Sequence, residues 1–258
     1  MHMPGPVPTW VLAVIAAVAG VAVGSFLAVL AARVTGGTGA AYPPARSGPA
    51  GRWPACGAAP RAAATVPGTG WRRPAGWCLL VELGTGAGFA LMALRFGPSP
   101  VLPAFLLLAA LAPVLTVTDL RSRRLPDPLT LPAYPAAAAL LAAGALASPG
   151  GARHLLSALA GLATAWLFFA LLAGIHPAGL GWGDVKLSGV LGLYLGWLGA
   201  AAVAAGLLGA FVLAALAGLG LIATGRATRK TQIPFGPFML ASAIAVIAAS
   251  GLAPVLAR

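Results

Sequence analysis

Long apolar runs separated by short polar loops fill most of this 258-residue chain. A helix needs about 20 apolar residues to cross the hydrocarbon core of a bilayer, and lipid offers no partners to a backbone that is not helical. Hydrophobic residues make up 60% of the chain and charged residues 8%, whereas soluble domains carry about 25% charged residues. The sequence therefore predicts an all-α, polytopic transmembrane helical bundle of about eight spans: 10–32, 77–94, 101–117, 129–147, 155–175, 185–198, 200–224 and 235–256.

Two parts of this division are less sharply defined than the rest. The sixth run is short, and no charged residue separates it from the seventh, so the turn near Gly199 is the weakest boundary. Residues 33–76 form the one long loop, which is rich in Gly, Pro, Ala and Arg and has few residues that could build a core. We expect two regions: residues 1–96, with two spans and this loop, and residues 97–258, with six spans.

The cations predict how the helices are oriented. Most of the 16 lysines and arginines fall in loops on one side of the predicted bundle, whereas Arg95, Arg153 and Arg258 fall on the other. Because cytoplasmic loops are enriched in Lys and Arg, we expect a protein of the bacterial cytoplasmic membrane with both termini outside. The same rule explains the net charge of +12. The basic loop lacks an aromatic ladder, so we expect the lipid bilayer and no nucleic acid as a partner.

Acidic residues are scarce, and the chain has only four of them: Glu82, Asp119, Asp127 and Asp184. An acid beside a bilayer is costly to keep charged, so those that remain are candidates for chemistry. Asp119 ends the third predicted span and Asp184 begins the sixth, both on the cytoplasmic side. Two carboxyl groups brought together there do not both ionise easily, so one stays protonated while the other activates water for attack on a peptide carbonyl. The dipole of the sixth helix favours Asp184 as the ionised base and Asp119 as the acid.

The setting of Asp184 allows two interpretations. Gly181 and Gly183 flank Trp182 just before it, and glycines permit unusual backbone angles and the close approach of an extended substrate. The same Gly-rich turn is equally typical of a helix that begins with an Asp N-cap.

Asp119 and Asp127 also fit structural roles when each is considered alone. Asp119 fits an ion pair with Arg121 or Arg123. Asp127 lies between two prolines at the start of the fourth predicted span. This setting favours a helix cap over a catalytic role.

Five short stretches follow one another along the chain: Gly24-Ser25-Phe26-Leu27, Val81-Glu82-Leu83, residues 119–130 ending in Leu-Pro-Asp-Pro-Leu-Thr, residues 181–187 (Gly-Trp-Gly-Asp-Val-Lys-Leu), and residues 233–238 (Ile-Pro-Phe-Gly-Pro-Phe). Each is weak alone. Together, and in this order, they make the chain resemble the prepilin peptidases, membrane aspartic peptidases that are also called type IV leader peptidases.

The resemblance implies that Asp119 and Asp184 are the catalytic carboxylates. It implies that the substrate is the positively charged leader of a type IV prepilin or pseudopilin, cut after a Gly at the cytoplasmic face. The product would feed a type IV pilus, a competence fibre or a type II secretion pseudopilus, and the peptidase step needs no cofactor. Residues in the matching motifs are expected to support the site or contact substrate: Asp127, Gly181, Gly183, Lys186, Pro234 and Gly236. Lys186 fits an interfacial, snorkelling lysine at least as well.

The cysteines depart from the pattern of this family. Many members carry two Cys-x-x-Cys pairs in the long loop, read as a zinc site, and a second activity that methylates the new N-terminus with S-adenosylmethionine. Here Cys56 and Cys78 are the only cysteines, whereas tetrahedral zinc needs four ligands. Ala28 stands where the family often has Asn. We therefore expect neither zinc nor methylation, and Glu82 fits either a helix cap or the methylating half.

Three other functions fit parts of the pattern. A presenilin-like protease also uses Gly-x-Gly-Asp, but it pairs this motif with a Tyr-Asp motif, whereas here Asp119 follows Thr118. A small multi-pass transporter would carry its acids near the bilayer midplane, whereas these acids lie at predicted helix ends. A non-catalytic assembly protein would have no need of both Asp119 and Asp184.

Overall fold

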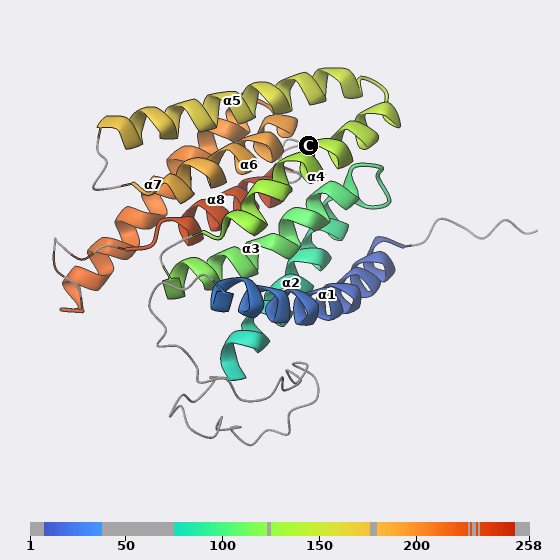
Figure 1. The fold of residues 1–258 in the computed structure, drawn as a ribbon. Coiled ribbons are helices and arrows are strands. Elements are labelled where there is room, and N and C mark those ends of the chain that lie inside the picture. The colour runs from blue at the N-terminus through green and yellow to red at the C-terminus, as the bar shows by residue number, and fades with distance from the viewer. Residues whose placement is uncertain are drawn as a thin grey trace, which may run out of the picture.

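The computed structural model describes residues 8–37, 75–122, 125–175, 180–226, 228, 231 and 233–250. The described part of the chain is a bundle of eight α-helices without strands (Figure 1). They are α1 (Thr9–Gly37), α2 (Ala75–Phe96), α3 (Leu102–Ser122), α4 (Asp127–Leu146), α5 (Gly151–Ile175), α6 (Trp182–Leu198), α7 (Ala200–Ala223) and α8 (Gly236–Ala249). Each overlaps one predicted span, so the all-α class is confirmed.

Six of these described helices are long and apolar enough to cross a membrane: α1, α2, α3, α4, α5 and α7. Helix α8 is a shorter apolar helix of 14 residues, and the end of its predicted span, residues 251–256, lies outside the described residues. Helix α6 has 17 residues, and nearly all those after its first turn are buried. The chain is therefore a multi-pass membrane protein in which the short helix α6 is largely buried by its neighbours.

The weakest predicted boundary, between α6 and α7, is a real break at Gly199. This residue has a φ of +120°, a backbone angle that residues with a Cβ rarely adopt. Its N–H donates to the carbonyls of Leu195 and Gly196, which closes α6. A glycine at this point thus separates two helices that hydropathy alone would join.

Small residues let neighbouring helices pack with their backbones in contact. At the α1–α2 crossing, a Cβ on Gly20 would stand 2.8 Å from the carbonyl oxygen of Thr85. At the α5–α6 crossing, a Cβ on Gly196 would stand 2.9 Å from the Cα of Ala158. Lipid gives apolar helices no hydrophobic reason to associate, so close packing at small residues is what brings them together.

Helix α6 is the centre of the larger part of the bundle. It packs along α5 and also contacts α4, α7 and α8, while α1 pairs with α2 on the side opposite α5 (Figure 1). The fully buried Tyr194 of α6 packs its ring against Phe105 of α3, with centroids 5.4 Å apart. Helix α6, whose first turn carries Asp184, is therefore held on several sides.

Candidate active site

Asp119 lies near the end of α3 and is only 5% exposed. Its Oδ2 accepts a hydrogen bond of 3.1 Å from the backbone N–H of Gly236, the first residue of α8. The first N–H groups of a helix have no partner within the helix. The start of α8 therefore supplies a donor to the buried carboxyl group of α3.

Glycine is needed at position 236 because the carboxyl group fills the space where a side chain would begin. A Cβ added there would stand 2.8 Å from Oδ2 and 3.3 Å from Cγ of Asp119. The preceding Pro234 is partly buried in the segment that leads into α8. The motif of residues 233–238, predicted to support the site, therefore contacts Asp119 directly through Gly236.

Asp184 is the third residue of α6, and Gly181 holds the N-cap position without a side-chain cap bond. The N-cap interpretation of Asp184 is therefore wrong. Its carboxyl group interacts with the backbone of Gly181 and lies close enough to Asp119 for the two carboxyl groups to interact electrostatically. The two acids that the sequence singled out therefore lie near enough for their charges to influence each other.

Arg121 has a partner other than Asp119. Its guanidinium carbon lies 5.0 Å from the centroid of the Trp77 ring, near the start of α2. Arg123, the other cation proposed to pair with Asp119, lies outside the described residues. For Asp119 the contact found is the hydrogen bond to Gly236 and not an ion pair with Arg121.

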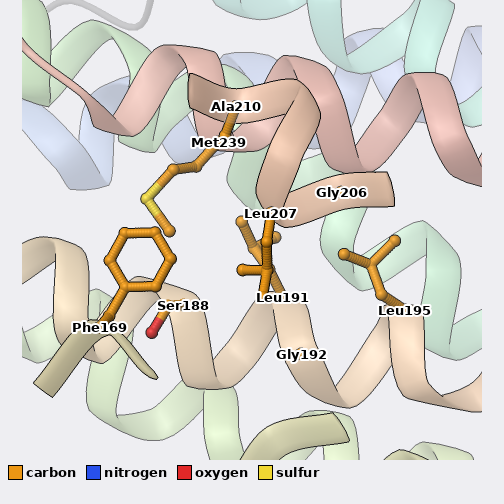
Figure 2. Close-up of a pocket in the computed structure, with 9 residues that line it drawn as sticks. All are labelled: Phe169, Ser188, Leu191, Gly192, Leu195, Gly206, Leu207, Ala210 and Met239. Carbon is orange, nitrogen blue, oxygen red and sulfur yellow. The ribbon is translucent and has the colours of Figure 1, made fainter. Parts of the chain in front are cut away.

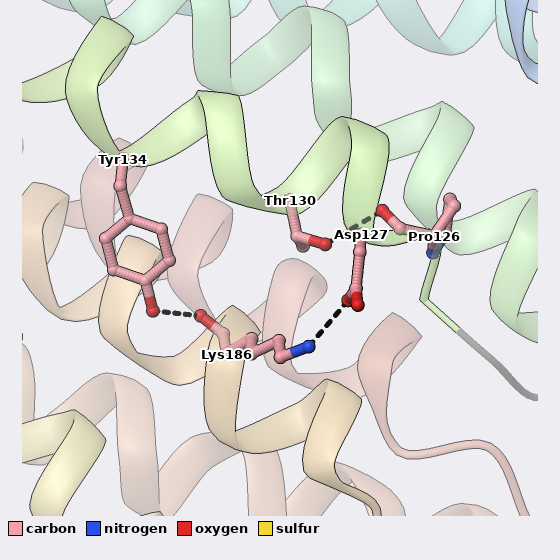
Figure 3. A network of polar contacts seen from close by, with 5 residues as sticks. All are labelled: Pro126, Asp127, Thr130, Tyr134 and Lys186. Atoms are coloured by element: carbon pink, nitrogen blue, oxygen red, sulfur yellow. Dashed lines mark hydrogen bonds and ion pairs between the residues drawn. The ribbon is translucent and has the colours of Figure 1, made fainter.

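Asp127 binds Lys186 and does not cap its helix. The N-cap of α4 is Pro126, with no side-chain cap bond, and Asp127 Oδ1 lies 2.7 Å from Lys186 Nζ (Figure 3). The preferred cap interpretation of Asp127 is therefore wrong. Lys186 is paired with this acid, a partner that the sequence did not indicate, and its snorkelling and electrostatic interpretations both stay predictions.

Tyr134 was missed by the sequence reasoning. Its hydroxyl, two turns along α4 from Asp127, donates to the carbonyl oxygen of Lys186 (Figure 3). The only sequence signal was a tyrosine inside an otherwise Ala- and Leu-rich run. A lone hydroxyl in such a run needs a partner, because an unpaired polar group in an apolar interior is costly.

An aromatic cluster lies beside the start of α8. The ring of Phe235, one residue before Gly236, lies 5.1 Å from that of Phe211 and 5.9 Å from that of Phe169. Phe169 also lines a small apolar pocket between α5, α6, α7 and α8 (Figure 2). Its one polar side chain, Ser188, donates to the carbonyls of Val185 and Ala165. The pocket has no free polar group to bind a substrate, whereas the cluster packs against the segment that carries Gly236.

Glu82 lies in the interior of α2, where its Oε1 accepts a hydrogen bond of 2.9 Å from Ser25 Oγ of α1. The helix-cap alternative for Glu82 is therefore wrong. Among the residues that the structure describes, no group of three or more His, Cys, Asp or Glu could hold a metal ion. Cys56 and nearly all of the long loop lie outside that part of the chain, so the expectation of no zinc stays a prediction.

Comparison with known proteins identifies the family. The family model described as "Type IV leader peptidase family" matches residues 101–253, more than half of the chain, and this range contains Asp119, Asp184 and Gly236. The chain belongs to the type IV leader peptidase family. The predicted resemblance is confirmed, and membership of this family makes the chain a peptidase.

Similar curated proteins bear one name, "Prepilin leader peptidase/N-methyltransferase". One from Burkholderia pseudomallei strain 1026b is 35% identical over 93% of this chain and 86% of its own length. Another, from strain K96243, is 39% identical over 65% of this chain and 53% of its own length. One from Bacillus subtilis is 32% identical, over 63% and 62% respectively. No solved structure gives a significant match.

Proposed function

We propose that this chain is a membrane aspartic endopeptidase that removes the leader of type IV prepilins or pseudopilins at the cytoplasmic face, cutting after a Gly. The family and the names of the similar proteins support the substrate class. The observation that supports the mechanism is the electrostatic interaction between the carboxyl groups of Asp119 and Asp184, which lie near the ends of two different helices.

The reaction needs one proton shared by the two carboxyl groups. The ionised carboxylate takes a proton from water, and the water oxygen attacks the carbonyl carbon of the Gly before the cut. The protonated carboxyl donates to the developing oxyanion and then passes its proton to the amine nitrogen as the C–N bond breaks. Every atom and proton is supplied by the peptide, the water and the two acids, so the step requires no cofactor.

The contacts of the two carboxyl groups do not favour either one as the base. Asp184 lies in the first turn of α6, where a helix dipole favours an anion. Asp119, however, accepts a hydrogen bond from the first residue of α8, so the same argument applies to both carboxyl groups. We therefore propose a coupled pair that titrates jointly. The backbone N–H of Gly236 already donates a hydrogen bond to Oδ2 of Asp119. The shared proton is therefore assigned to Oδ1 of that residue.

The test is processing of a co-expressed prepilin by variants of the four acids. We expect Asp119→Asn and Asp184→Asn each to lower the rate of cleavage by roughly a thousandfold or more. When two residues act as a unit in catalysis, loss of either one removes most of their joint effect on the rate. Asp127→Asn should be milder. Glu82→Gln is the matched control, since this acid pairs with Ser25 in α1, and its cleavage should stay near wild type. Near-normal cleavage by either dyad variant would refute the mechanism.

We also propose that the mature N-terminus leaves this enzyme unmethylated, because Cys56 and Cys78 supply too few ligands for the zinc that we associate with the methylating region. The relatives carry an N-methyltransferase in their names, so this is a point on which the chain would differ from them. Mass spectrometry of the mature pilin tests it. A mass increment of one methylene at the N-terminus would contradict the proposal.

A further inference from the structure

One face of α6 packs against the beginning of α4 over the two turns that carry Asp184. Residues three apart lie on neighbouring positions of one helix face. Lys186 and Gly189 of α6 contact α4, and Gly183 faces Leu125, which leads into α4. Asp184 follows Gly183 by one residue, about 100° further around the helix. The contacts with α4 therefore fix the direction in which Asp184 points.

Lys186 is bound to α4 through both its side chain and its backbone. Its ammonium nitrogen lies 2.7 Å from Oδ1 of Asp127, and its backbone carbonyl accepts a hydrogen bond from the Tyr134 hydroxyl. Both partners belong to α4, two turns apart (Figure 3). A residue held by its side chain and its backbone to the same neighbouring helix cannot rotate about the axis of its own helix without breaking one of the two contacts.

Packing reinforces the polar contacts at the other two positions. A Cβ on Gly183 would stand 3.2 Å from Cβ of Leu125, the buried residue just before α4. A Cβ on Gly189 would collide with the Tyr134 hydroxyl. The two glycines therefore let the start of α4 lie directly on the backbone of α6.

The ion pair between Lys186 and Asp127 is expected to contribute little to the stability of the fold. The side chains of Lys186 and Asp127 are 32% and 55% exposed, and exposed ion pairs contribute little to stability. The start of α6, meanwhile, has no side-chain cap. This ion pair stabilises the fold little, but it joins α4 to α6 only two residues from Asp184. It is therefore better suited to positioning Asp184.

We propose that Asp127, Lys186 and Tyr134 form an orientation clamp that fixes the rotation of the first two turns of α6 and so holds Asp184 against Asp119. The clamp residues touch neither the water nor the scissile bond, so they are positioning residues. This inference rests on the proposed function, in which Asp184 is one of the two reacting acids. It predicts that the clamp acts on the rate of the chemical step and not on leader binding.

The test measures kcat and KM for cleavage of a purified prepilin in detergent. We expect Asp127→Asn and Lys186→Met each to lower kcat about tenfold with KM unchanged, because small misplacements of a reacting group cost large factors in rate. The reversed pair, Asp127→Lys with Lys186→Asp, should recover kcat to within about threefold of wild type, since paired residues are not additive. Tyr134→Phe keeps the ring on Gly189 and should lower kcat about threefold by loss of one hydrogen bond.

Two matched controls come from the same end of the bundle. Thr130→Val removes a hydroxyl of α4 that donates within its own helix, to Pro126. Arg121→Gln removes a cation that lies over Trp77 and not against α6. Both should keep kcat within about twofold of wild type, because neither contact crosses from α4 to α6.

Three results would overturn the clamp. A raised KM with unchanged kcat in Asp127→Asn would make Asp127 a binding residue for the cationic leader. A reversed pair slower than either single variant would show that each residue acts independently of the other. Unchanged kcat in Tyr134→Phe and Lys186→Met, while Asp119→Asn and Asp184→Asn stay inactive, would end the inference and leave the proposed function standing. Active dyad variants would instead refute the proposed function.

Discussion

Gly236 shows how a single backbone group can set the geometry of a side chain that we propose to be catalytic. Its N–H is directed at Asp119 Oδ2, and the two residues are so close that no side chain fits between them. Gly236 is not among the described glycines with positive φ, so an alanine could adopt its backbone angles. The need for glycine there comes from Asp119 alone.

Gly236→Ala should therefore lower prepilin cleavage at least tenfold while the protein still folds, because the new methyl group would push the Asp119 carboxyl away from its place beside Asp184. Gly220→Ala is the control, since a Cβ on that glycine of α7 meets nothing within 4 Å. Cleavage of a co-expressed prepilin and the melting temperature in detergent are the two measurements. Equal cleavage by both variants would contradict the role given to Gly236.

The sequence singles out candidate site residues more readily than it predicts their contacts. Scarcity of acids in an apolar chain pointed to Asp119 and Asp184, since each charge beside lipid is costly. The partner of Asp127 could not be predicted, because Lys186 is 59 residues away in the chain and helix packing alone brings the two together. A proline-flanked acid at a helix start favoured a cap, and the tertiary ion pair overrode that local preference.

At the scale of the helix, the division into spans follows from hydropathy, and the pairing of helices follows from small residues. The position of each helix was predictable because about 20 apolar residues can only be a span. Which helices are neighbours was not, because α5 and α6 associate through the shapes of their surfaces and not through hydrophobicity. The close approach of Gly161 to Gly192 is visible only once the two helices are placed together.

The α5–α6 crossing gives a prediction about stability. A Cβ on Gly192 would overlap the carbonyl oxygen of Gly161 and stand 2.7 Å from Cβ of Ala165. Gly192→Ala should thus destabilise the protein by about 1–3 kcal/mol, as overpacking does. Gly174→Ala, where a Cβ meets nothing within 4 Å, should leave the melting temperature unchanged. The measurement is thermal unfolding of both variants in detergent, and a Gly192→Ala protein as stable as wild type would contradict this packing.

At the scale of the whole molecule, polar side-chain contacts distinguish the two ends of the bundle. One end of the bundle contains the hydrogen bond between Gly236 and Asp119 and the ion pair of Asp127 with Lys186. The opposite end contains Arg95, whose guanidinium donates to the carbonyl of Ile247 near the end of α8. The two acids that we propose as a dyad therefore lie at the end that the cation distribution predicts to be cytoplasmic.

This orientation predicts which new cysteines are accessible in intact cells. Thr228, between α7 and α8, is exposed at the dyad end, and Ala147, after α4, is exposed at the other. In a background with Cys56→Ser and Cys78→Ser, a membrane-impermeant maleimide should label Ala147→Cys in intact cells and Thr228→Cys only after lysis. The reverse pattern would place Asp119 and Asp184 outside the cell. A leader that stays in the cytoplasm could not reach them there, so this labelling tests the proposed function independently of any catalytic variant.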